Sequence, residues 1–99
     1  MRIMLVCAGG MSTSILMKKM EKWAIEKGVE LEVKAYGIGN YAEHYKDYDC
    51  ILIGPQISYK AAEIEGNVDI PVDQIQSFDY AVGNVENIMK EVDVLLKRP

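Results

Sequence analysis

Residues 2–14, RIMLVCAGGMSTS, decide the fold that the sequence predicts. Residues 2–7 form a short and almost continuously apolar run, which is typical of a strand buried on both faces of a parallel sheet. Two glycines follow, and the apolar residues then recur at a helical spacing, at Leu16, Met20, Trp23 and Ala24. A strand, a glycine turn and a helix in this order predict the first half of a right-handed βαβ unit.

The rest of the chain repeats this alternation of strands and helices. Residues 29–37 alternate apolar and charged side chains, as a strand near a sheet edge does, whereas residues 49–54 form a second apolar run. The predicted strands are residues 2–7, 29–37, 49–54 and 70–75, and the predicted helices lie within residues 11–28, 55–66 and 84–99, with a short helix or an irregular crossover at residues 38–48. We therefore predict one α/β domain over residues 1–99, a four-stranded parallel sheet with helices on both faces.

Particular residues predict where the helices begin and end. Ser12 or Thr13 is expected to cap the start of the first helix, and Asn84 the start of the last one. Gly28 and Gly66 are expected to end the helices that precede them.

The composition limits the class of partner. The chain has 99 residues and a net charge of −4 at pH 7, which argues against a nucleic-acid partner because binding to phosphates needs clustered Lys and Arg. No apolar run approaches the roughly 20 residues that span a bilayer, and the run after Met1 is too short for a signal peptide. The two cysteines, without other signs of a secreted domain, indicate a reduced, cytoplasmic chain. His44, the only histidine, has no second ligand at metal spacing, so we expect a surface or half-buried residue and no metal site.

Cys7 stands where a strand end meets a helix start, at the edge where parallel α/β sheets bind their ligands. Free thiols have a pKa of about 8.5, and the positive end of a helix favours both the thiolate and a phosphate placed on it. Gly9 and Gly10 allow a tight turn that aims backbone amides at one point, and the hydroxyls of residues 12–14 can donate further hydrogen bonds. Core packing is the alternative for any cysteine, and we expect it for Cys50, which lies within a strand. Three consecutive hydroxyl residues favour a functional role for Cys7.

Two motifs carry a resemblance to a known family. Cys7 followed by GMSTS (residues 10–14), together with LIGPQISY (residues 52–59), resembles enzyme IIB of the lactose/cellobiose family, including diacetylchitobiose enzymes, of the bacterial phosphoenolpyruvate-dependent sugar phosphotransferase system. The resemblance covers nearly the whole chain. It implies a fold similar to low-molecular-weight tyrosine phosphatases and a cytoplasmic phosphoryl carrier without a cofactor.

The resemblance also implies a role for each matching residue. Cys7 would accept a phosphoryl group from a phosphohistidine of enzyme IIA and pass it to a sugar carried by the membrane-embedded enzyme IIC. The sugar would be a β-linked disaccharide such as cellobiose, lactose or chitobiose, and the chain alone would be a monomer. The residues implied to hold the phosphate are Ala8, Gly9, Gly10, Met11, Ser12, Thr13 and Ser14, and those of a docking rim are Gly54, Pro55 and Gln56.

Two other functions stay open on the sequence. A regulatory module that senses sugar flux would use the same fold without phosphorylating sugar directly. A thiol phosphatase or an enzyme like arsenate reductase is less favoured, because the phosphatase loop C-x5-R-[ST] places an arginine where this chain has Thr13. That guanidinium would clamp the phosphate oxygens and stabilise the charge of the transition state.

Overall fold

Four parallel strands form one sheet in the order β2-β1-β3-β4. The computed structural model describes residues 1–9 and 13–97. The strands are β1 (Arg2–Cys7), β2 (Glu32–Gly37), β3 (Cys50–Ile53) and β4 (Val72–Gln74). The predicted four-stranded parallel sheet is confirmed, with β2 at one edge, as its sequence indicated, and β4 at the other.

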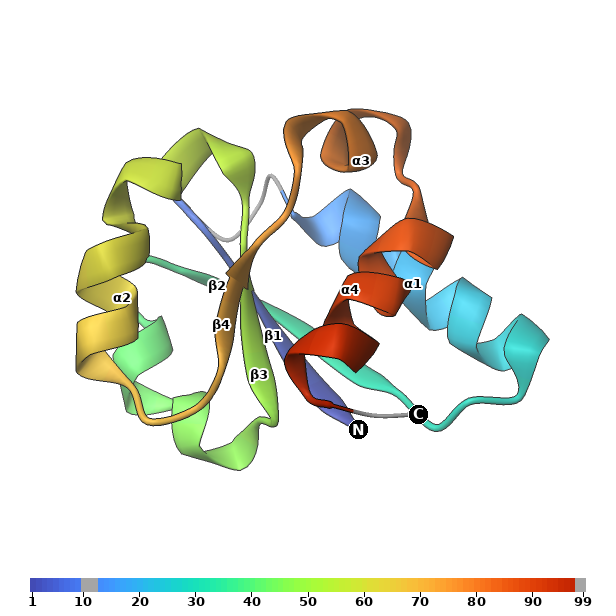
Figure 1. Cartoon of the computed structure of the whole chain (residues 1–99), viewed down its shortest axis with the longest axis horizontal. Coiled ribbons are helices and arrows are strands. Elements are labelled where there is room, and N and C mark those ends of the chain that lie inside the picture. Colours follow the sequence, from blue (N-terminus) through green and yellow to red (C-terminus); the bar gives the residue numbers. More distant parts are fainter. Residues whose placement is uncertain (10–12, 98–99) are drawn as a thin grey trace.

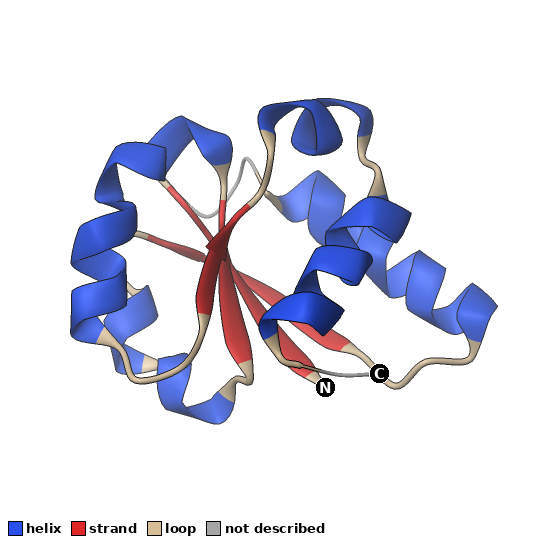
Figure 2. Ribbon diagram, in the orientation of Figure 1, coloured by secondary structure: helices blue, strands red, loops and turns tan. Residues whose placement is uncertain are grey.

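Helices cover both faces of this sheet (Figures 1 and 2). Ile3 and Leu5 of β1 pack in one hydrophobic cluster with residues of α1 and α4, while Met4 and Val6 pack in the other cluster with residues of α2. Both faces of β1 are therefore dry, which is why its sequence is an apolar run and does not alternate. On the first face lie α1 (Ser14–Lys27), α3 (Ser77–Val82) and α4 (Val85–Leu95), and on the second face lie α2 (Ala61–Asn67) and the 3₁₀ helices η1 (Tyr41–Glu43), η2 (Tyr45–Asp47) and η3 (Pro55–Lys60).

Two predicted helix ends were wrong, and one helix was missed. Gly66 does not end α2, which continues to Asn67, and the last helix ends at Leu95 and not at the end of the chain. Residues 77–82 form α3, which the sequence pattern did not indicate, because this helix is short and its buried residue is Asp79 rather than an apolar one.

The predicted caps at Gly28 and Asn84 are confirmed. Gly28 adopts the left-handed conformation (φ 68°) that ends α1, and its amide donates to the carbonyls of the last turn. The side chain of Asn84 accepts a hydrogen bond at its Oδ1 from the amide of Asn87 (3.2 Å), which satisfies one free donor at the start of α4.

Replacing Asn84 with alanine should lower the free energy of unfolding by about 1 kcal/mol, because the amide of Asn87 then loses its acceptor. Urea denaturation of the variant and the parent chain would measure this difference. Asn40→Ala is the matched control, since Asn40 is exposed and its side chain caps no helix. A change larger than about 0.5 kcal/mol in that control, or none in Asn84→Ala, would contradict the assignment.

The two edges of the sheet carry different parts of the chain. The carboxyl ends of the strands meet at the upper edge in Figure 1, where α3 also lies. Met1 and the last turn of α4 lie near each other at the opposite edge (Figure 1), and Met1 and Leu95 pack against the same hydrophobic cluster. Residues that follow the strand ends are thus gathered on one side, away from the ends of the described chain.

Candidate active site

Cys7 is the last residue of β1 and lies at the carboxyl edge of the sheet, as predicted from the topology. Its side chain is fully buried. The hydroxyl of Thr13 donates a hydrogen bond from Oγ1 to Cys7 Sγ over 3.4 Å, which is a normal separation for a sulfur acceptor. The structure therefore brings together the first residue of the glycine turn and the residue that precedes α1.

Thr13 occupies the capping position of α1 without capping it. Its carbonyl accepts the amide of Met17 (2.9 Å), but its side chain makes no hydrogen bond to the helix and turns to the sulfur instead. The prediction of a Thr13 cap was therefore wrong, and Ser12 lies outside the described residues. No acidic residue occupies the first turn of α1, so its own side chains do not neutralise the positive end of the helix dipole beside Cys7.

Gly54 connects the second sequence motif to this pair. Its amide donates to the carbonyl of Val6 (2.9 Å), directly before Cys7. A methyl group built on Gly54 would lie 3.6 Å from Thr13 Cγ2 and 3.0 Å from Gln56 Oε1. The backbone after β3 thus packs against Thr13, and Gln56 folds back over it while remaining exposed. Pro55 is half-buried at the start of η3.

The end of β2 supports the start of the loop. Gly9 pairs with Gly37 in an isolated antiparallel bridge, and Ala8 and Gly9 are exposed. A Cβ atom on Gly37 would lie 3.3 Å from the carbonyl carbon of Gly9, so a larger residue would press on the loop. Sequence reasoning missed Gly37, although a glycine at the end of the strand beside β1 was a usable signal.

The other predicted loop residues are less informative. Ser14 is half-buried and begins α1. Gly10, Met11 and Ser12 lie outside the described residues, so the amide ring predicted around the sulfur stays a prediction.

A family model for the lactose/cellobiose-specific IIB subunit of the phosphotransferase system matches residues 2–94. The chain belongs to this IIB family. The resemblance of its two motifs is confirmed, and the chain is a component of a sugar phosphotransferase system.

Several relatives carry the same component name. The oligo-beta-mannoside-specific EIIB component of Bacillus subtilis (strain 168) is 36% identical over 86 residues, which cover 84% of each chain. The galactose-specific EIIB component of Lactococcus lactis subsp. cremoris is 30% identical over 102 residues, covering 95% of this chain and 94% of the relative. A lactose-specific EIICB component of Staphylococcus haemolyticus is 28% identical over 79% of this chain, but over only 14% of its own length.

A solved structure shares both the fold and much of the sequence. The cellobiose-specific IIB component of Borrelia burgdorferi superposes with a TM-score of 0.76 at 31% identity, covering 91% of this chain and 85% of that one. The doubly covered parallel sheet of this IIB chain is thus the fold of its family.

The second cysteine of this IIB chain has the opposite environment. Cys50 is buried in the hydrophobic cluster under α1 and α4. Burial, followed by the nearby carboxylates of Asp49 and Asp73, raises the pKa of its thiol to about 12. Cys50 is therefore a neutral core residue at physiological pH, as predicted.

The remaining candidate groups lie away from Cys7. His44 is exposed, and its ring stacks on Tyr36 with the ring centroids 4.9 Å apart. Within residues 1–9 and 13–97, no three His, Cys, Asp or Glu side chains are placed to hold a metal ion. In the same part of this IIB chain, no helix is both long and apolar enough to cross a membrane.

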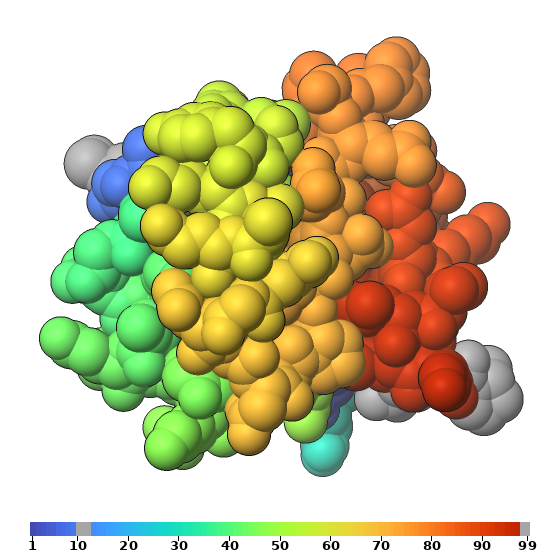
Figure 3. Space-filling model, turned by 60° about the vertical axis from the view of Figure 1, so that its left-hand side comes forward, coloured from blue at the N-terminus to red at the C-terminus, as the bar shows by residue number. Residues whose placement is uncertain are grey.

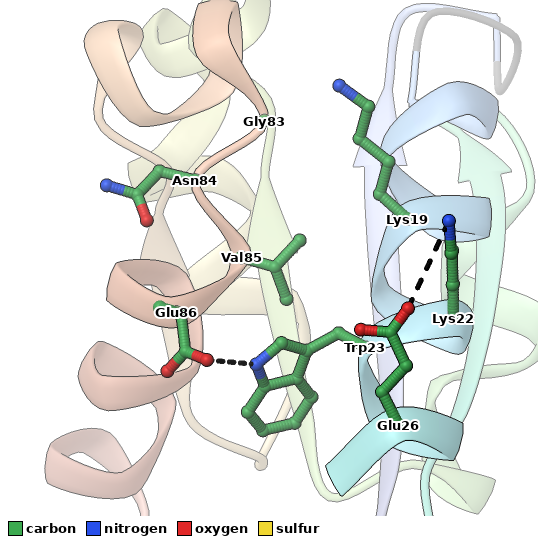
Figure 4. Close-up of a pocket in the computed structure, with 8 residues that line it drawn as sticks. All are labelled: Lys19, Lys22, Trp23, Glu26, Gly83, Asn84, Val85 and Glu86. Atoms are coloured by element: carbon green, nitrogen blue, oxygen red, sulfur yellow. Dashed lines mark hydrogen bonds and ion pairs between the residues drawn. The ribbon is translucent and has the colours of Figure 1, made fainter.

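A cleft of about 380 Å³ separates α1 from the α3–α4 turn (Figure 4). Trp23 Nε1 donates to Glu86 Oε1 across it (2.9 Å), whereas Lys22 approaches Glu26 of the same helix α1 at 4.0 Å. The cleft contains none of the predicted site residues of this IIB chain; it is lined by Lys19, Lys22, Trp23, Glu26, Gly83, Asn84, Val85 and Glu86.

Proposed function

We propose that Cys7 carries the phosphoryl group of this IIB subunit. The sulfur attacks the phosphorus of a phosphohistidine on enzyme IIA, an S–P bond forms, and the N–P bond breaks with its electron pair left on the imidazole. In the second step a sugar hydroxyl, held by enzyme IIC, attacks the phosphorus, the S–P bond breaks to return the thiolate, and the hydroxyl proton leaves to a base or to water. The observation that supports this most directly is the Thr13 hydroxyl donating to Cys7 Sγ beside the start of α1.

The electrostatics of the loop suit a carrier better than a hydrolase. The Thr13 hydroxyl and the positive end of α1 favour negative charge on the sulfur and on a phosphoryl group attached to it. Residues 7–14 contain no Lys or Arg, so no cation of the loop would drive the attack of water on that phosphoryl group. The intermediate then lasts until the next partner arrives.

The burial of Cys7 sets an order of events. Nucleophile and phosphorus must approach to about 3–3.5 Å in line, which a fully covered sulfur does not allow. Cys7 therefore reacts in a conformation in which the groups that cover its sulfur have moved aside. We propose that this change occurs when the donor docks. Between partners, the same cover keeps water from the thiophosphate bond.

The surface around the carboxyl edge of the sheet supports protein docking. Four large apolar side chains are exposed on the first turn of α1, on η3 and on α3, the elements that follow the strand ends. Both η3 and α3 reach the upper edge of the molecule (Figures 1 and 3). Exposed apolar residues gathered near a reactive group favour an interaction surface over random exposure. We call this surface the rim; it consists of Pro55 and Gln56 with Ile15, Tyr59, Phe78 and Val82, while Gly54, the other residue predicted for a docking rim, is buried.

The partners follow from the family. We propose that the rim of this chain, a cytoplasmic monomer of one domain, meets enzyme IIA first and enzyme IIC second. The EIICB relative supports an encounter with IIC, because its name joins the two components in one protein. We propose a β-linked disaccharide such as cellobiose, lactose or chitobiose as the sugar, which the names of the oligo-beta-mannoside and cellobiose relatives support and that of the galactose relative does not.

The test is a labelling experiment with phosphoenolpyruvate, enzyme I, HPr and a matched enzyme IIA. One labelled phosphate per chain is expected, located on Cys7 by mass spectrometry, and its transfer to sugar should need vesicles that contain enzyme IIC. A label on any other residue would refute the assignment of Cys7. A label on Cys7 that no IIC and no sugar can remove would favour the regulatory module.

An aryl phosphate such as p-nitrophenyl phosphate should not be hydrolysed by this chain above the rate of a Cys7→Ala variant. The phosphatase loop needs an arginine where Thr13 is buried, and the acid that could protonate a leaving group, Asp79, is itself buried and accepts a hydrogen bond from Asn87. Release of nitrophenol followed by absorbance provides the measurement. Brisk turnover that depends on Cys7 would favour a thiol phosphatase instead.

A further inference from the structure

The helix α3 is built in an unusual way for an element on a docking surface. It has six residues, which is too short for a helix to be stable without support from the rest of the protein. It exposes two large apolar side chains, Phe78 (70% exposed) and Val82. Its one buried side chain is the carboxylate of Asp79, at 3% exposure. Half-buried Tyr80 also packs against the hydrophobic cluster, so α3 is held by one apolar contact together with the polar contacts of Asp79.

Three hydrogen bonds link Asp79 of α3 with Asn84 and Asn87 at the start of α4, and two of them are made by Asp79 itself. Asp79 Oδ2 accepts a hydrogen bond from Asn87 Nδ2 over 2.6 Å. The backbone carbonyl of Asp79 accepts the amide of Asn84 (2.9 Å), and Asn84 Oδ1 in turn accepts the amide of Asn87 (3.2 Å). The connection is closed, because each of the three residues bonds to the other two.

The opposite end of α3 meets α1. Gly83 ends α3 in the left-handed conformation (φ 65°), and a Cβ atom on it would lie 2.5 Å from Lys19 Nζ. Figure 4 shows the Lys19 side chain extending from α1 toward Gly83. An ammonium group near the carboxyl end of a helix is favourable for the helix dipole. One side of α3 is thus fixed by Asp79, and its end lies against a long, flexible side chain.

A buried carboxylate is a costly anchor for a helix compared with an apolar side chain of similar size. The advantage of the carboxyl group is that a hydrogen bond is directional. The bond to the side-chain amide of Asn87 fixes the rotation and position of α3, whereas apolar packing tolerates small shifts. On α3 a small rotation would move Phe78 and Val82 on the rim.

We propose that Asp79 is a positioning residue for phosphoryl transfer: through its hydrogen bond to Asn87 it holds α3 so that Phe78 and Val82 meet the phosphoryl donor. This inference rests on the proposed function. Asp79 takes no part in the chemistry, and its effect is on the affinity for the docked partner. A donor that binds only molecules with α3 correctly placed has an apparent affinity proportional to the fraction of such molecules. A variant that lowers this fraction therefore binds the donor more weakly.

The test measures phosphate transfer from phosphorylated enzyme IIA over a range of donor concentrations. Asp79→Ala and Asn87→Ala should each raise the half-saturating donor concentration about tenfold, with the rate at saturation nearly unchanged. Asp79→Asn keeps an oxygen acceptor for Asn87 Nδ2 and should restore most of the affinity. The double variant should be no worse than Asp79→Ala, because the two residues act through one bond.

The matched control is Asp69→Ala, which removes an exposed aspartate that precedes β4 at the other edge of the sheet. It should leave the half-saturating concentration unchanged. If Asp79→Ala and Asn87→Ala lower only the thermal unfolding midpoint and the labelled fraction, the role is structural and the proposal is wrong. If the parent chain takes no phosphate on Cys7, the proposed function fails first, and this outcome is distinct because all variants then fail alike.

Discussion

Replacing Cys7 with serine should abolish phosphate incorporation, with a loss of at least about 10³-fold in the rate of transfer from phosphorylated enzyme IIA. The serine hydroxyl would occupy nearly the same volume at the end of β1 and could still accept the hydrogen bond from Thr13. An alcohol ionises far less readily than a thiol, so the hydroxyl of Thr13 and the dipole of α1 do not make the serine a nucleophile. Rapid-quench measurements with labelled donor would determine the rate.

Cys50→Ala is the control for this variant. Both cysteines are fully buried, so a loss caused by disturbing a buried thiol should affect the two variants equally. We expect Cys50→Ala to keep full labelling, because its thiol is neutral and lies in the core. A serine variant that still takes one phosphate per chain would mean that another residue is the acceptor.

Replacing Thr13 with valine should slow the transfer step by about 100-fold, the lower end of the roughly 10²- to 10³-fold loss seen when one preorganised donor to a reacting group is removed. Valine has nearly the shape of threonine, so the buried site keeps its packing while Cys7 Sγ loses the hydroxyl that donates to it. Single-turnover transfer from phosphorylated enzyme IIA measures the effect directly.

Thr13→Ser separates the two parts of this side chain. It keeps the hydroxyl for Cys7 and removes Cγ2, the atom of Thr13 that approaches Gly54. We expect a rate within about threefold of the parent chain, since the donor to the sulfur is retained. Slow transfer in the serine variant together with normal transfer in the valine variant would show that packing against Gly54 matters and the hydrogen bond does not.

The fold was predictable where a local pattern has one physical cause. A continuous apolar run such as residues 2–7 indicates burial on both faces, and Ile3 and Met4 do face opposite helical layers. Gly28 ends α1 and Asn84 begins α4 through contacts with residues no more than one helical turn away. In contrast, α3 depends on a bond from Asp79 to a residue eight positions away, which no apolar periodicity reveals.

The site was predictable in its location and less so in its contacts. Because carboxyl ends of parallel strands share an edge, the sequence alone brings Cys7 and Gly54 to the same side. The cap rule failed at Thr13, since a sulfur from another element competes for its hydroxyl. The burial of Cys7 and the close approach of Gly37 to Gly9 arise from packing between segments distant in sequence, which a single chain without its structure does not specify.

The two ends of the described chain lie at the edge of the sheet remote from Cys7 (Figure 1). A polypeptide extension attached there leaves the reactive side unobstructed, as would an affinity tag. The lactose-specific EIICB relative is much longer than its matched segment, and a flexible linker joined at this edge would raise the local concentration of such a segment without fixing its orientation. The side of the sheet that carries Cys7 would then stay open to both proposed partners in turn.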